Sequence, residues 1–194
     1  MRPWTRRAVD MRGWIRECWR IWRRMVACTD PRCTPEEYLG MSSASGDKAT
    51  IVRTAGARAQ PALSTLYVLS AVGNLGKKGV IMVIGHTDCG LQGADDEEIR
   101  RLLVGAVDEG QEEKARGTLR EARFGAFVRP DISVMEDVDM LTASPFFRGM
   151  EIVGFVQDTE TGLVTEVSEW RVQENRKSDV QSREIEQAKA NGGK

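Results

Sequence analysis

A run of five apolar residues, Val80–Ile84, constrains the fold of this chain more than any other feature of its sequence. Most of these residues are β-branched, and the run shows no alternation with polar residues, which is typical of a strand buried on both faces of a parallel sheet. Gly85 follows the run, and His86 and Cys89 come next. An imidazole and a thiol are therefore expected just after the carboxyl end of a buried strand, where open α/β sheets build their binding sites.

His86 and Cys89 form a candidate metal-binding pair. Imidazole nitrogen and thiolate sulfur are ligands that zinc prefers, and a spacing of two residues lets both reach one ion from a single turn. His86 is also the only histidine of the chain. The alternative interpretation is a polar loop after a core strand, with Cys89 as a small buried hydrophobic residue. One such pair is half of a zinc site, so the rest of the site has to come from elsewhere in the chain.

Composition excludes several classes of protein. The 194 residues suffice for one domain with a hydrophobic core and short extensions. With 28 basic and 29 acidic residues, the net charge of −1 gives no field that would attract nucleic acid or a membrane. No apolar run is long enough to span a bilayer, and the arginine-rich start without a continuous apolar stretch leads us to expect no secretory signal. The four cysteines (Cys18, Cys28, Cys33 and Cys89) do not resemble a disulfide framework, so we predict a cytoplasmic protein that binds neither nucleic acid nor membrane.

Residues 1–24 predict an amphipathic helical arm. The segment contains eight arginines and four tryptophans, and its apolar residues recur every three or four positions between Met11 and Met25. The expected role is packing on the chain's own domain or on a partner subunit. A mitochondrial targeting segment is the second interpretation, although Asp10, Glu17 and the lack of serine oppose it. Nucleic-acid binding through arginine and tryptophan is the third, and nothing else in the chain supports it.

The remaining pattern alternates between strands and helices. We expect a weak strand at 25–27, a helix from Thr34, a strand at 49–52, a helix from Pro61 to Val72, the strand at 80–84, a helix at 95–104, exposed charged helix and loop at 105–123, a helix at 131–141, and a hairpin of 150–157 with 163–167. This order predicts an α/β fold, with a central, mainly parallel sheet of four to five strands flanked by helices. The predicted zinc-binding domain spans residues 25–170, and residues 171–194 form a polar tail.

A second block, Cys28-x-Asp30-x-Arg32, lies where a first parallel strand would end. If that strand neighbours the strand before His86, then Cys28, His86 and Cys89 converge on one point. Three protein ligands with a fourth position open to solvent are typical of catalytic zinc. The Arg32 guanidinium can hold the Asp30 carboxylate in a fixed orientation beside the metal, although the pair can also be read as a surface turn worth little energy. Cys33 is expected to be a bystander thiol.

These two blocks resemble the β-class carbonic anhydrases when they are taken in order with four others: Arg53–Arg58, Phe127–Leu141, Ser144-Pro145 and the hairpin around Gly154–Gly162. The resemblance covers residues 25–168. It implies an enzyme that interconverts carbon dioxide and bicarbonate by means of a zinc-bound hydroxide. It implies Cys28, His86 and Cys89 as the zinc ligands, and Asp30 and Arg32 as the catalytic pair. It also places Gly56 and Gly90 where the backbone turns close to the site.

The resemblance further implies a homodimer or a dimer of dimers, with each site lined partly by the partner subunit. The chain departs from the family pattern at its N-terminus, where an Arg/Trp-rich segment replaces the usual apolar strand before Cys28. Relatives that hydrolyse carbonyl sulfide or carbon disulfide share the same blocks, so that reaction is an alternative. A second alternative is an inactive, zinc-stabilised dimeric interaction protein. Because no second histidine exists, the proton must leave through buffer, water or a carboxylate such as Asp88.

Overall fold

The computed structural model describes residues 23–39, 41, 49–72 and 79–167, and its centre is a five-stranded sheet of order β2-β1-β3-β4-β5. The strands are β1 (Arg23–Cys28), β2 (Thr50–Thr54), β3 (Val80–His86), β4 (Glu151–Gln157) and β5 (Val164–Glu166). The first four run parallel, and β5 pairs antiparallel with β4 as the second strand of the predicted hairpin. The predicted α/β class with a mainly parallel sheet is confirmed.

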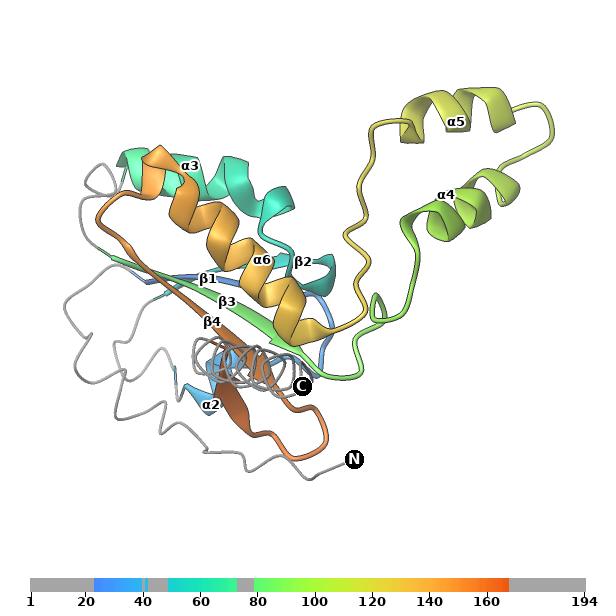
Figure 1. The fold of residues 1–194 in the computed structure, drawn as a ribbon. Coiled ribbons are helices and arrows are strands. Elements are labelled where there is room, and N and C mark those ends of the chain that lie inside the picture. Colours follow the sequence, from blue (N-terminus) through green and yellow to red (C-terminus); the bar gives the residue numbers. More distant parts are fainter. Residues whose placement is uncertain (1–22, 40, 42–48, 73–78, 168–194) are drawn as a thin grey trace, which may run out of the picture.

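Helices cover both faces of this sheet. Helices α3 (Leu63–Val72) and α6 (Pro130–Ala143) lie over one face, and the short helix α2 (Pro35–Tyr38) lies on the other (Figure 1). Alternate residues of β3 face the two layers, so Ile81 and Val83 join the core beneath α3 and α6, while Met82 and Ile84 join the core on the side of α2. Every residue of β3 is buried. The continuous apolar run is therefore explained by burial of both faces.

Strand β1 is stronger than the sequence suggests. It has six residues instead of the expected three, all are buried, and it pairs with β2 on one side and β3 on the other. Arg23 and Arg24, which we predicted on the polar face of a helix, lie in this strand, and the strand therefore begins before residue 25. The rest of the predicted arm (1–22) and the predicted tail (171–194) lie outside the described residues.

Arg24 shows why a charged residue can occupy a central strand. Only 2% of its surface is exposed, and its Nη2 donates a hydrogen bond of 3.0 Å to the carbonyl oxygen of Leu69. This carbonyl belongs to the last turn of α3, where helix carbonyls lack partners within the helix. Burial lowers the pKa of Arg24. The long aliphatic stem packs in the core while the guanidinium hydrogen-bonds to a carbonyl oxygen at the end of the helix. No pattern among neighbouring residues in the sequence predicts this hydrogen bond.

Helices α4 (Asp96–Gly105) and α5 (Glu112–Leu119) form an arm that projects away from the sheet (Figure 1). Asp95 caps α4 by accepting hydrogen bonds from the backbone N–H groups of Glu97 and Glu98. Helix α5 contains no buried residue, as expected for the charged stretch that carries it. Within the described part of the chain, no helix combines the length and the apolar character needed to cross a membrane.

Candidate metal centre

Three side chains meet at the carboxyl edge of the sheet. Strands β1 and β3 are paired with Ala27 opposite Ile84, so Cys28 and His86 end neighbouring strands. The ligand atoms of Cys28, His86 and Cys89 all lie within 4.8 Å of one another, and the two sulfur atoms are 3.9 Å apart. All three residues are buried. The predicted convergence of distant parts of the chain is therefore observed.

Hydrogen bonds orient the imidazole of His86. Its Nδ1 lies 2.8 Å from the carbonyl oxygen of Thr87 and donates to it, which leaves the lone pair on Nε2. The Thr159 hydroxyl also donates to that carbonyl oxygen, at 3.2 Å. Nε2 is buried and has no hydrogen-bond partner among the residues that the structure describes. A buried nitrogen with a free lone pair beside two thiols is what a metal ligand requires.

The two thiols of the group influence each other's ionisation. Their shared hydrogen bond lowers the pKa of Cys28 and raises the pKa of Cys89, because one proton serves both sulfur atoms. The backbone N–H of Asp30 also donates to Cys28 Sγ, at 3.4 Å. Cys33 behaves differently: it lies outside the group, and burial raises its pKa to about 11. Two ionisable sulfurs and one imidazole form a donor set that suits zinc.

Asp30 lies beside this group and is held by Arg32. Arg32 Nε donates to Asp30 Oδ1 at 3.1 Å, and Nη2 donates to Oδ2 at 2.8 Å, so the contact is bidentate. The backbone N–H of Arg32 also donates to Oδ1. The guanidinium hydrogen bonds are the largest cause of a pKa for Asp30 of about 2. An ionised carboxylate oxygen, Oδ2, thereby lies 3.9 Å from His86 Nε2.

Other residues hold the turn that carries Cys28 and Arg32, and sequence reasoning gave them no role in the site. Arg53 of β2 donates to the carbonyl oxygens of Cys28, at 2.8 Å, and Cys33, at 2.9 Å. Gln157, which ends β4 opposite His86, donates through Nε2 to the carbonyl oxygen of Arg32 at 3.0 Å. A polar residue at the end of an apolar strand was the available signal for Gln157.

Asp88 is the most prominent residue that sequence reasoning left without a structural role. Arg32 Nη1 donates to Asp88 Oδ2 at 2.6 Å, and Nη2 donates to the Asp88 carbonyl oxygen at 2.8 Å. Asp88 has a left-handed backbone conformation, with φ of 55°. Aspartate tolerates this conformation better than most residues. The residues next to Asp88 in the sequence give no indication that Arg32 is its partner.

The two glycines named from the resemblance differ in their surroundings. Gly56 has a φ of 63° in the turn after β2, and a Cβ added there would lie 3.0 Å from Phe127 and 3.1 Å from Leu91. Leu91 follows Cys89 by two positions, so the turn at Gly56 packs against the segment that carries a candidate ligand. Gly90 adjoins Cys89, but an added Cβ would meet no atom within 4 Å. Of these two positions, close packing therefore requires glycine at 56 and not at 90.

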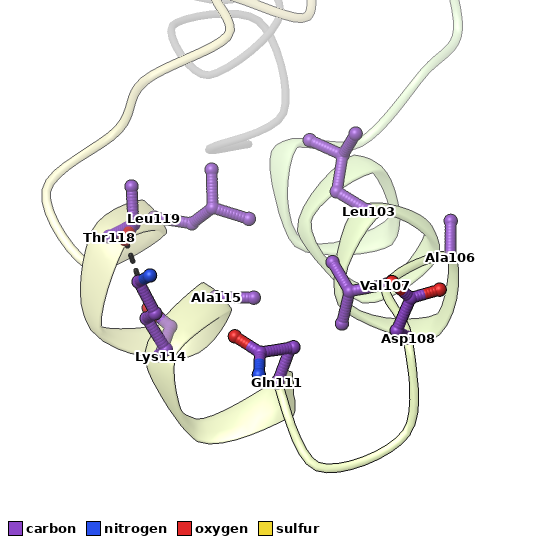
Figure 2. Close-up of a pocket in the computed structure, with 9 residues that line it drawn as sticks. All are labelled: Leu103, Ala106, Val107, Asp108, Gln111, Lys114, Ala115, Thr118 and Leu119. Carbon is purple, nitrogen blue, oxygen red and sulfur yellow. Dashed lines mark hydrogen bonds between the residues drawn. The ribbon is translucent and has the colours of Figure 1, made fainter.

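A separate hollow lies in the arm and has no part in this chemistry. It is a mostly apolar groove of about 550 Å³ between α4 and α5 (Figure 2). Its lining residues are Leu103, Ala106, Val107, Asp108, Gln111, Lys114, Ala115, Thr118 and Leu119. None of them is a cysteine or histidine, so the groove offers no soft metal ligand.

The fold and this site define an α/β protein with a Cys-His-Cys group at the carboxyl edge of a parallel sheet. Solved structures of other proteins match the chain. A carbonic anhydrase from Streptococcus mutans is 30% identical, with a TM-score of 0.59 over 75% of this chain and 80% of that one. A carbonic anhydrase from Glaciozyma antarctica is 25% identical, with a TM-score of 0.64 over the same shares. The apo form of a carbon disulfide hydrolase shares the fold, at 22% identity and a TM-score of 0.55 over 79% of this chain and 83% of that one.

The chain belongs to the β-class carbonic anhydrase family. No family model and no curated protein matches its sequence.

Proposed function

We propose that this protein is a zinc-dependent carbonic anhydrase that catalyses the reversible hydration of carbon dioxide to bicarbonate. The observation that carries this proposal is the buried Cys28–His86–Cys89 group beside the ionised carboxylate of Asp30. Membership of the family supports it as well. All five residues that the resemblance implies for ligation and catalysis occur together at one edge of the sheet.

Cys28, His86 and Cys89 would hold the zinc ion through two sulfurs and Nε2. Bound zinc lowers the pKa of a coordinated water and thereby supplies a nucleophile near neutral pH. The hydrogen bond that Nδ1 donates to the carbonyl oxygen of Thr87 fixes the neutral tautomer of His86 that ligation through Nε2 requires. The negative charge of two thiolates offsets the charge of the ion, so the protein must help to activate the water. Asp30 is the group placed to give that help.

Asp30 acts as a hydrogen-bond acceptor for the attacking water. Arg32 keeps the carboxylate ionised and occupies both of its oxygens from the outer side. Oδ2 also faces the ligand group, where it can accept a hydrogen from the water and direct the remaining lone pair at the carbon of carbon dioxide. Addition of water to carbon dioxide gives bicarbonate and one proton. With no second histidine in the chain, buffer or water takes that proton, or the exposed carboxylate of Asp88 does so.

Hydrolysis of carbonyl sulfide or carbon disulfide at the same site is the second candidate reaction. It is supported by the fold shared with a carbon disulfide hydrolase. Discrimination between such similar small molecules rests on small differences in the pocket. We favour carbon dioxide because the carbonic anhydrases from Streptococcus mutans and Glaciozyma antarctica are more similar to the chain in sequence than the carbon disulfide hydrolase is. An inactive interaction protein is the third candidate, and the intact set of five site residues opposes it. We propose a homodimer or dimer of dimers as the functional assembly.

Parallel assays with the two kinds of substrate test this proposal. Zinc-loaded protein should hydrate carbon dioxide in stopped flow faster than it releases hydrogen sulfide from carbonyl sulfide. Asp30→Asn should lower the hydration rate by about 10²-fold or more, while Asp108→Asn, in the distant arm, should leave it unchanged. The rate should also rise with buffer concentration at fixed pH. Faster hydrolysis of carbonyl sulfide would replace the proposed reaction, and a zinc-loaded protein inert toward both gases would refute enzymatic function.

A further inference from the structure

The guanidinium of Arg32 is divided between two acidic residues. One edge makes the bidentate contact with Asp30, two positions away in the same turn. Nη1 donates to the carboxylate of Asp88, 56 positions further along the chain, at 2.6 Å, and Nη2 also donates to the Asp88 carbonyl oxygen at 2.8 Å. Both acidic residues raise the pKa of Arg32, Asp30 more than Asp88. Arg32 therefore forms an ionic bridge between Asp30 and Asp88. The role that the resemblance implies for Arg32 accounts for its contact with Asp30 and not for its contact with Asp88.

The bridge joins the two ligand-bearing turns. Arg32 belongs to the turn that follows β1 and Cys28, whereas Asp88 lies between His86 and Cys89 after β3. The contacts from Arg53 and Gln157 hold only backbone carbonyls of the first turn. They leave the direction of the guanidinium to Asp30 and Asp88. Asp30 and Arg32 belong to the same turn, so their contact cannot fix the guanidinium relative to the turn after β3. Among the described residues, the contact with Asp88 is the one that does so.

The solvent exposure of Arg32 and Asp88 limits how much their contact can contribute to stability. The side chain of Arg32 is 49% exposed and that of Asp88 is 79% exposed, so the pair adds little to folding stability. Charge-assisted and multiple hydrogen bonds nevertheless fix the orientation of a planar guanidinium well. In its left-handed backbone conformation, Asp88 presents its side-chain Oδ2 and its backbone carbonyl oxygen to Arg32. The expected consequence lies in geometry at the site, with a small effect on unfolding.

We propose that Asp88 is a positioning residue, which fixes the Arg32 guanidinium so that Asp30 Oδ2 stays directed at the ligand group. Asp88 acts through Arg32 and touches neither substrate nor metal in this role. Loss of its carboxylate frees one side of the guanidinium, and Asp30 then loses its fixed direction. The catalytic consequence rests on the proposed hydration reaction, whereas the effect on Arg32 does not.

Asp88→Asn is the principal test, because asparagine also tolerates the left-handed backbone and keeps the shape and the carbonyl oxygen. Nuclear magnetic resonance of the arginine side chains, with the Arg32 signal assigned by its loss in Arg32→Lys, reports rotation of the guanidinium. In the metal-free wild type this rotation should be slow, with separate Nη signals. In Asp88→Asn the signals should merge. Asp88→Gly, which suits the backbone and removes the carboxylate entirely, should show the same change if the first variant folds poorly.

Activity provides the second measurement. Asp88→Asn should lower kcat/KM for hydration about tenfold at unchanged zinc content. Asp88→Glu should recover part of the loss, and Asp108→Asn should match the wild type. Slow Arg32 rotation in both Asp88 variants would overturn the proposal, and so would a free Arg32 with wild-type kcat/KM. If the wild type itself does not hydrate carbon dioxide, the proposed function fails, and the resonance measurement alone decides the positioning role.

Discussion

The two segments that follow β3 are built in opposite ways. His86 and the turn after it place two buried side chains, His86 and Cys89, in contact with distant parts of the chain, such as Cys28 and Thr159. The α4–α5 arm comes next, and its prominent polar contacts join residues of the same segment, 96–126. Asp96 accepts from backbone N–H groups of 124–126, and Arg100 donates to the carbonyl oxygens of Leu119 and Ala122.

The metal-site turn and the arm are therefore held in place by different kinds of interaction. Strand pairing in the core sets the geometry of the ligand group, so a change in packing beneath the sheet should spread to the site. The arm is closed by its own helix caps and bridging side chains, so changes there should remain local. Three substitutions test this difference, and they are ordered here by the size of the expected effect.

Gly154→Ala should have the largest effect on stability. Gly154 lies in β4 beneath α6, and an added Cβ would come within 2.6 Å of Val134 and of Val167. Relief of this overlap requires the helix or the strand to shift, which should lower the free energy of unfolding by about 1–3 kcal/mol. Denaturant unfolding measures the loss. A free energy equal to that of the wild type would show that the core beneath α6 yields more easily than its packing indicates.

Asp96→Asn should weaken the arm by about 1 kcal/mol and leave the site unaffected. Burial acts to raise the pKa of Asp96, but the three backbone N–H donors outweigh it, and the net shift is downward from 3.8. A lowered pKa in the folded state stabilises the arm above the unfolded pKa, and this stabilisation is lost as pH falls through the folded value. Amide exchange at 124 and 126 should therefore be faster in the variant near neutral pH, and the difference should shrink in acid. Unchanged exchange would contradict this role.

Gly117→Ala should produce the smallest change, and one of opposite sign. Gly117 lies within α5, and a Cβ added there would meet no atom within 4 Å. Removal of the conformational freedom of glycine from a helix interior should stabilise the arm by about 0.5–1 kcal/mol. Amide exchange within α5 should slow accordingly, with zinc content unchanged. Destabilisation would mean that α5 packs against a surface that the described residues do not include.

Sequence reasoning succeeded where a pattern depends on neighbours in the chain and failed where it depends on distant partners. The run before His86 predicted a buried strand because continuous apolar character suffices for that inference. Strand β1 was underestimated, because burial of Arg24 depends on the carbonyl of Leu69, 45 positions away. The bridge from Arg32 to Asp88 was missed for the same reason. The meeting of Cys28, His86 and Cys89 was predictable because the resemblance connects blocks that periodicity alone does not join.

Zinc content of matched cysteine variants tests the central claim most directly. Cys28 and Cys33 are both buried and lie at the two ends of the turn that follows β1, but of the two only Cys28 belongs to the group around His86. Purified wild-type protein and Cys33→Ser should each contain about one zinc per chain, and Cys28→Ser should lose most of it, because ligation requires the deprotonated sulfur. Equal zinc in Cys28→Ser and the wild type would contradict the assignment of this site.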